Sequence, residues 1–153
     1  MIFREQGITQ KSVQRKITTQ AVKATMQEIG LFWHRRFLPE HFKPGAAAKY
    51  GYHTRQDKWK KRKLRETGKD VDLVFKGKMR DMMVSFARVS GSAKRVRIEM
   101  QGPEYVYYHN KGREATRITP AEEVELRRMA EEFFHFKVHE IIMDTRPETT
   151  KVG

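Results

Sequence analysis

The sequence contains no cysteine and no long apolar run, and each absence excludes a class of function. Without cysteine the chain forms no disulfide framework, no thiolate zinc site and no cysteine nucleophile. The lack of a run of about 18 apolar residues, and of a basic and then apolar leader, predicts a protein made in the cytoplasm that neither spans a membrane nor is secreted. The glycines at 77, 91, 102 and 112 stand singly, so no glycine-rich phosphate loop is present.

Acidic residues are scarce relative to basic ones. The 153 residues include 32 Lys or Arg against 19 Asp or Glu, a formal net charge of +13. This length is typical of one domain, and we expect residues 1–143 to form a single α+β domain followed by a flexible tail over 144–153. The charge excess disfavours a compact monomer and favours an anionic partner. Nucleic acid, an acidic protein face and a membrane surface all qualify.

Two long helices are predicted, one near each end. Apolar residues spaced three and four apart predict a helix from Gln10 to about Phe37, which Pro39 then ends. Near the other end, the segment ITPAEE has the pattern of a capping box, with Thr119 as N-cap and Glu122 three residues later. The helix that follows, about 120–143, has a wide apolar face suited to covering a sheet.

Short segments with strand character lie between the helices. They span residues 71–75, 84–90, 95–100 and 105–110. In the third segment, Val96, Ile98 and Met100 fall on one side of the strand and the charged residues on the other. A helical turn is expected after Gly77, before the second segment. The order of elements predicts an α+β fold, with an antiparallel sheet of about four strands packed by the N-terminal and C-terminal helices.

Residues 38–70 are predicted to form an extended basic arm or insertion, because they lack an apolar stripe and exceed the length of an ordinary connection. The arm carries ten Lys or Arg against four acidic residues. Its large side chains are candidate anchors on another subunit: Tyr50, Tyr52, Trp59 and Leu64. Its clustered basic residues are candidate contacts to DNA or to an acidic partner: Lys58, Lys60, Lys61, Arg62, Lys63 and Arg65. The alternative is a solvated helical face whose Trp59 and Leu64 turn inward.

Catalytic patterns are weak. His135 and His139 have the four-residue spacing of zinc hydrolases, but Phe136 stands where such an enzyme needs a glutamate base, and a third ligand has no clear candidate. A histidine pair of this kind is more often a surface or packing feature. The carboxylates of the C-terminal helix alternate with basic residues, which predicts intrahelical ion pairs. We therefore expect no enzymatic activity, no metal and no cofactor.

The order of several segments resembles a known family. The segments are HRRFLPEHF, AAAKYGYHTRQDKWKKRK, DLVFKGKMRDMM, YVYYHNKG and the helix after ITPAEE, and together they run from about residue 25 to 140. The chain resembles the neck, tail-completion and virion-morphogenesis proteins of tailed bacteriophages, which typically show LxxTGxLrxs before the sheet and YAxxHxxG on the last strand. The matching positions are Leu73, Gly77, Met79 and Arg80 in the first motif, and Tyr107, His109 and Gly112 in the second.

The resemblance implies a small structural α+β subunit without catalytic activity. It implies assembly as a homo-oligomeric ring, a hexamer or dodecamer, in the neck or tail region of the virion at the head-tail interface. The implied neighbours are the portal, adaptor, head-closure or tail-tube proteins, with DNA in the channel and arms lying over adjacent subunits. The alternative from the residues alone is a stand-alone basic protein that binds nucleic acid without sequence specificity, although no recognised nucleic-acid-binding module is present.

Overall fold

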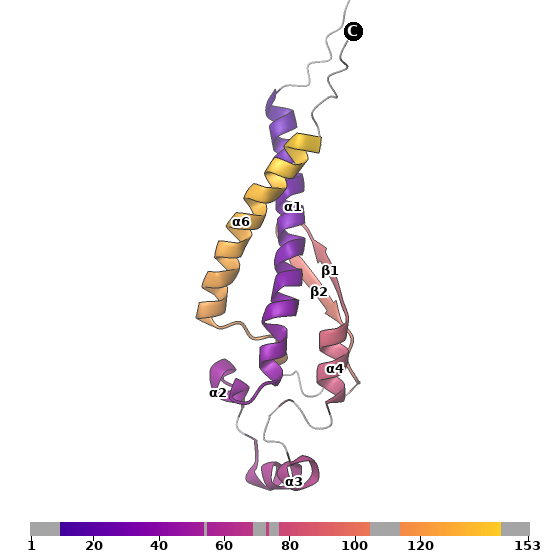
Figure 1. Cartoon of the computed structure of the whole chain (residues 1–153), viewed down its shortest axis with the longest axis vertical. Coiled ribbons are helices and arrows are strands. Elements are labelled where there is room, and N and C mark those ends of the chain that lie inside the picture. Colours follow the sequence, from indigo (N-terminus) through magenta and orange to yellow (C-terminus); the bar gives the residue numbers. More distant parts are fainter. Residues whose placement is uncertain (1–9, 54, 69–72, 74–76, 105–113, 145–153) are drawn as a thin grey trace, which may run out of the picture.

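The computed structural model describes residues 10–53, 55–68, 73, 77–104 and 114–144. In chain order its elements are α1 (Gln10–Arg36), η1 (Leu38–Phe42), α2 (Ala46–Tyr50), α3 (Asp57–Thr67), α4 (Lys78–Ser85), β1 (Ala87–Gly91), β2 (Val96–Met100), η3 (Glu114–Thr116) and α6 (Pro120–Asp144). Figure 1 shows an elongated molecule with α1 along its length, α6 on one side of α1, and the two strands on the other. The short helix α3 lies at one end.

The predicted α+β fold with a sheet of about four strands is wrong. Most of the described residues are helical, and their only sheet is an antiparallel pair, β1 and β2. The segments 71–75 and 105–110 lie outside the described residues except for Leu73, which sits in a turn. The segment 84–90 becomes a strand only from Ala87, because its first residues complete α4.

Helical spacing explains why α4 extends into the predicted strand. Met79 and Met83 are four residues apart and are both buried, and the next residue, Val84, packs against the same core. This spacing of three and four places the side chains on one face of a helix, and it outweighs the short alternation that suggested a strand. The expected helical turn after Gly77 is confirmed, and it is two turns long.

The predicted long helices are both confirmed as α1 and α6. The main core is built around the C-terminal end of α1, where Trp33 and Phe37 are buried together with residues of η1, α4 and η3. Phe32 of α1 also meets Phe133 of α6 edge to face, with ring centroids 6.2 Å apart. His34 also connects α1 to α4, because its Nε2 donates a hydrogen bond of 2.8 Å to the carbonyl oxygen of Met83.

The predicted extended arm over residues 38–70 is wrong for its first part. Leu38, Phe42, Tyr50 and Tyr52 are all buried inside the chain, in the short helices η1 and α2 or just after them. No apolar stripe marks this stretch in the sequence because each short element supplies only two apolar side chains to the interior, Leu38 and Phe42 from η1 and Ala46 and Tyr50 from α2. Residues 55–68 are different, since α3 stands apart from the other helices at the end of the molecule (Figure 1).

The β-hairpin packs on α1 through the half-buried side of each strand. Val89 of β1 pairs with Ile98 of β2, and the alternation predicted for Val96, Ile98 and Met100 is confirmed, since all three are half-buried while their neighbours are exposed. The approach of the hairpin to the helix is very close. A Cβ atom on Gly91 would lie 2.6 Å from the carbonyl oxygen of Lys23 and 2.8 Å from a backbone nitrogen of α1.

We predict that Gly91→Ala lowers the free energy of unfolding by about 1–3 kcal/mol, because the added methyl group meets the backbone of α1 rather than a movable side chain. The control is Ser90→Ala, on the exposed side of the same strand, which should change stability by no more than about 0.5 kcal/mol. Denaturant unfolding of the three proteins gives the comparison. Equal stability of the Gly91 variant and its control would contradict the close packing of hairpin and helix.

Candidate assembly interface

The first turn of α6 is held by the capping box expected from the sequence. The backbone nitrogen of Thr119 donates to Oε2 of Glu122 at 3.1 Å, and the backbone nitrogen of Glu122 donates to Oγ1 of Thr119 at 3.3 Å. The cap therefore uses one carboxylate oxygen of Glu122 and leaves the other for a second contact. Glu122 is buried, so that second oxygen requires a partner from the protein.

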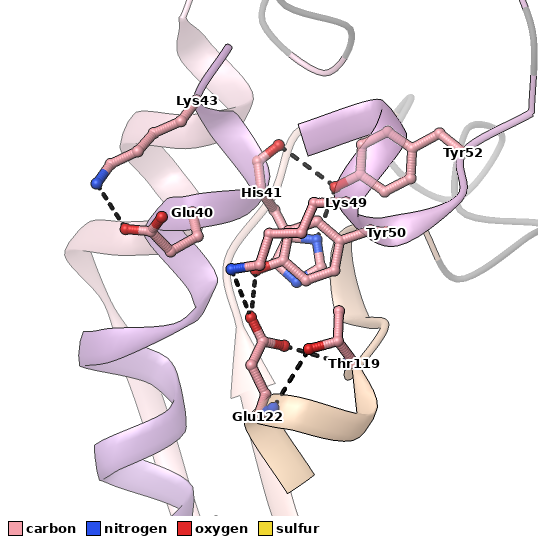
Figure 2. A network of polar contacts seen from close by, with 8 residues as sticks. All are labelled: Glu40, His41, Lys43, Lys49, Tyr50, Tyr52, Thr119 and Glu122. Carbon is pink, nitrogen blue, oxygen red and sulfur yellow. Dashed lines mark hydrogen bonds and ion pairs between the residues drawn. The ribbon is translucent and has the colours of Figure 1, made fainter. Parts of the chain in front are cut away.

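The second oxygen of Glu122 binds α2. Oε1 accepts a hydrogen bond of 2.6 Å from the hydroxyl of Tyr50 and lies 2.8 Å from Nζ of Lys49. Figure 2 shows both groups pointing at this one carboxylate oxygen. Because residues 50 and 122 are far apart in the sequence, the contact fixes α2 against the start of α6. The guanidinium of Arg117 strengthens the same junction by donating to the backbone oxygens of Tyr50, at 3.0 Å, and Gly51.

Aromatic rings complete the junction on the other side of Tyr50. The imidazole of His41 stacks on the Tyr50 ring with centroids 3.6 Å apart and planes 15° from parallel. Nδ1 of His41 also shares a hydrogen bond of 2.7 Å with the hydroxyl of Tyr52 (Figure 2). The tyrosines expected to anchor another subunit therefore lie inside their own chain, where they join η1, α2 and α6.

Burial and charge shift the titration of the two central groups. Burial raises the pKa of the Tyr50 phenol well above its ordinary value, and the hydrogen bond to Glu122 raises it further. Burial alone would raise the pKa of the Glu122 carboxyl. The hydrogen bonds from Lys49, Tyr50 and the Thr119 backbone, together with the positive charge of Lys49, outweigh burial and lower that pKa below its ordinary value of 4.5.

The basic helix α3 differs from its predicted arrangement. Lys63 is only 2% exposed, and its ammonium group lies 5.0 Å from the centroid of the Trp59 ring, whereas Leu64 is 55% exposed. The expected surface contact of Lys63 with DNA or an acidic partner is therefore not available in this conformation. The remaining predicted basic contacts are exposed: Lys58, Lys60, Lys61, Arg62 and Arg65. Of the predicted anchors, Leu64 is at the surface and Trp59 is half-buried.

A second exposed apolar region lies on α6, and sequence analysis did not identify it. Phe136 is 63% exposed and Met143 is 49% exposed, although the helix was expected to bury a wide apolar face. Val124 and Ile142 of the same helix are exposed too. The sequence contains the signal, because α6 carries more apolar side chains than one neighbouring helix can cover.

The motif residues of the resemblance are only partly within the described chain. Gly77 precedes α4 as its N-cap with φ of 87°, a left-handed conformation that favours glycine. Met79 is buried in the main core, Leu73 packs against that core, and Arg80 is exposed beside Asp81. The second motif, with Tyr107, His109 and Gly112, lies outside the described residues.

Neither a metal site nor a membrane span is found in the part of the chain that the structure describes. His135 and His139 are both exposed on α6, and no group of three His, Asp or Glu side chains among the described residues is arranged to hold a metal ion. None of the described helices is both long and apolar enough to cross a lipid bilayer.

Comparison with other proteins adds no assignment. No protein-family model, curated protein or solved structure matches the chain.

We predict that Glu122→Gln lowers the free energy of unfolding by about 1–3 kcal/mol near neutral pH, because the amide nitrogen cannot accept the hydrogen bonds that one carboxylate oxygen accepts. The folded-state pKa of Glu122 is lowered, so its charge stabilises the fold above pH 4.5 and this contribution is lost as the pH falls through the folded-state pKa. The difference from the parent should therefore shrink as the pH falls below 4.5 and through the lowered pKa of the folded state. Denaturant unfolding across this range is the measurement.

The matched control for Glu122→Gln is Glu123→Gln, one residue along the same helix. Glu123 is exposed and pairs with Arg127 one turn later, so its loss should cost no more than about 0.5 kcal/mol. A Glu122 variant that behaves like this control at every pH would show that the junction contributes little to stability.

Proposed function

We propose that the protein is a structural virion subunit of a tailed bacteriophage, which assembles as a homo-oligomeric ring in the neck or tail-completion region at the head-tail interface. The strongest support is the pair of exposed apolar side chains Leu64 and Phe136, which lie on separate helices of one elongated chain. Phe136 is joined by Met143, which is also exposed seven residues later on the same face of α6, and exposed apolar side chains that share one face mark surfaces that other proteins cover. The resemblance to neck and tail-completion proteins supplies the kind of assembly.

The position of Gly77 is consistent with this proposal. The family that this chain resembles has a glycine two residues before the position of Met79. In this chain that glycine is the N-cap of α4, whose buried methionines enter the core. The glycine of the motif is therefore required structurally, because its left-handed conformation at the N-cap allows α4 to begin directly after the preceding turn. A motif that stabilises the fold, rather than lining a pocket, suits a subunit that acts through its surfaces.

The charge distribution suits a subunit close to DNA. The exposed basic residues of α3 stand at one end of the molecule, away from the core, where they can contact phosphate groups or an acidic neighbour (Figure 1). In the proposed ring the partners are further copies of the chain and the adjoining portal, adaptor, head-closure or tail-tube proteins. The proposal assigns the protein no catalytic step and no cofactor.

The same helix favours one alternative function, a stand-alone protein that binds nucleic acid without sequence specificity. Five exposed Lys or Arg on α3 are enough for salt-dependent contact with phosphates. The two functions differ in what they require of the chain, because a ring subunit must associate with its copies and be found in purified particles. A free nucleic-acid-binding protein needs neither property.

We predict that replacing residues 57–67 by a flexible Gly/Ser segment of the same length leaves a folded core but stops head-tail joining. This replacement spares η1 and α2, whose side chains belong to the core, and removes only the projecting helix. The test expresses the variant in place of the parent protein during phage growth and counts joined tailed particles by electron microscopy. Circular dichroism of the purified variant checks that the core is folded.

The control for the α3 replacement is Arg88→Ala, an exposed change on the outer side of the hairpin that should leave particle numbers unchanged. Normal numbers of tailed particles from the α3 replacement would contradict the assembly role of this helix. Absence of the protein from purified particles, together with loss of duplex binding in the α3 replacement, would favour the nucleic-acid-binding alternative.

A further inference from the structure

Charge is divided unevenly between two of the helices. The helix α3 has six Lys or Arg against two acidic residues, in keeping with the whole chain at +13. The helix α6 has the opposite bias, with seven Asp or Glu against three Lys or Arg. A strongly basic protein that concentrates its acidic residues on one helix has two surfaces that attract each other.

The outer side of α3 presents an apolar side chain between ammonium groups. Leu64 is 55% exposed, and Lys60 and Lys61 stand four and three residues before it, which makes them its neighbours on the helix surface. Trp59 and Lys63 are directed elsewhere, since both are at least half-buried. The exposed side of α3 is therefore an apolar knob flanked by positive charge.

The matching pattern on α6 is a stripe formed by Glu132, Phe136, Glu140 and Met143, which we call the acidic-apolar stripe. Its members are four, four and three residues apart, so they share one face of the helix. All four are exposed, with Phe136 at 63% and Met143 at 49%. These exposed apolar side chains and carboxylates are complementary to the knob on α3 in hydrophobicity and in charge.

The basic neighbours of the stripe are already engaged. Nζ of Lys137 lies 2.9 Å from Glu140 and 4.0 Å from Glu28, and Arg128 pairs with Glu132 one turn away. Exposed ion pairs within a helix contribute little to stability, so the carboxylates can accept a second cationic partner at small cost. The stripe thus presents oxygen acceptors and apolar surface together.

The two surfaces of one chain are far apart. In Figure 1 α3 lies at one end of the molecule, whereas α6 rises away from that end and its final residues lie near the other. The knob cannot reach the stripe of the same chain in this arrangement. Contact between them requires two copies.

We infer that α3 of one copy docks on the acidic-apolar stripe of the next copy. Leu64 packs against Phe136 and Met143. Lys60 and Lys61 face Glu132 and Glu140. The contact joins different surfaces of the two copies, so it repeats from copy to copy and forms a ring where the rotation closes. The inference deepens the proposed ring and rests on that proposal for closure, while the contact itself rests on the two surfaces.

A second copy suits these surfaces better than nucleic acid does. A phosphate backbone can use Lys60 and Lys61 but offers nothing to an exposed Leu64 between them. The acidic-apolar stripe, for its part, offers carboxylates and apolar side chains, neither of which binds phosphate, and it suits a cationic partner with apolar surface. Among the helices that the structure describes, α3 of another copy meets both requirements, since it carries ammonium groups beside an exposed apolar side chain.

The test is reciprocal charge reversal, measured by sedimentation velocity of the purified full chain. One variant is K60E/K61E on α3, and the other is E132K/E140K on α6. Each variant alone places like charges at every contact, so its self-association should weaken by at least about tenfold. An equimolar mixture should recover association, because each contact then pairs opposite charges again. The control is R88E/K94E, which reverses two exposed charges on the hairpin and should associate like the parent.

Three further measurements make the outcome decisive. Circular dichroism checks folding, and the variants L64S and F136S test the apolar contact without altering charge, each with weaker association expected. Retention on a random-sequence DNA duplex tests the competing partner. The proposed contact is overturned by a parent protein that stays monomeric, by charge variants that associate like the parent, or by a mixture without recovery. Loss of only duplex binding in K60E/K61E, with association intact, also overturns it and favours nucleic acid as the partner of α3.

These results are separable from the proposed function. Recovery of association in the mixture, with the protein absent from purified phage particles, would support the contact and contradict the virion role. Detection of the protein in particles, together with unaltered association of the charge variants, would support the virion role and contradict the proposed contact.

Discussion

The carboxylate of Glu122 makes two different contacts at once, and the arrangement of the surrounding helices depends on both. One oxygen caps the first turn of α6, and the other binds Tyr50 and Lys49 of α2. A cap alone would fix only where α6 begins. A buried carboxylate without Lys49 and Tyr50 would favour its neutral form, so the cap, the ion pair and the hydrogen bond stabilise one another. Through this single side chain the region after α1 is joined to the last helix.

The long elements could be predicted because their signals are local. The second half of α1 has apolar residues three and four apart at Val22, Met26, Ile29 and Trp33, and α6 has a capping box whose two hydrogen bonds are both present. The alternation of Val96, Ile98 and Met100 likewise gave the correct face of β2. Each of these patterns depends on neighbours within a few residues, so no knowledge of the rest of the chain is needed.

The errors lie where distant residues decide the outcome. Tyr50 and Tyr52 appeared to belong to an arm because no apolar period surrounds them, but Glu122 and His41 give them partners that the sequence spacing does not reveal. Helix α3 shows the same limit at a smaller scale. Its Lys63 is buried over Trp59 while Leu64 is exposed, the reverse of what the hydrophobicity of the two side chains suggests. The long methylene stem of lysine and the face of an aromatic ring allow this exchange.

The net charge of +13 constrains any assembly of this protein. Copies of a uniformly basic chain repel one another, and at physiological salt this repulsion extends over about 8 Å. Association therefore needs local attraction, which an acidic α6 facing a basic α3 provides, and it gains from a polyanion that neutralises the remaining charge. In the proposed ring, DNA in the channel is such a polyanion. In that proposed ring the excess positive charge would favour enclosure of DNA, and the acidic helix would allow like-charged subunits to touch.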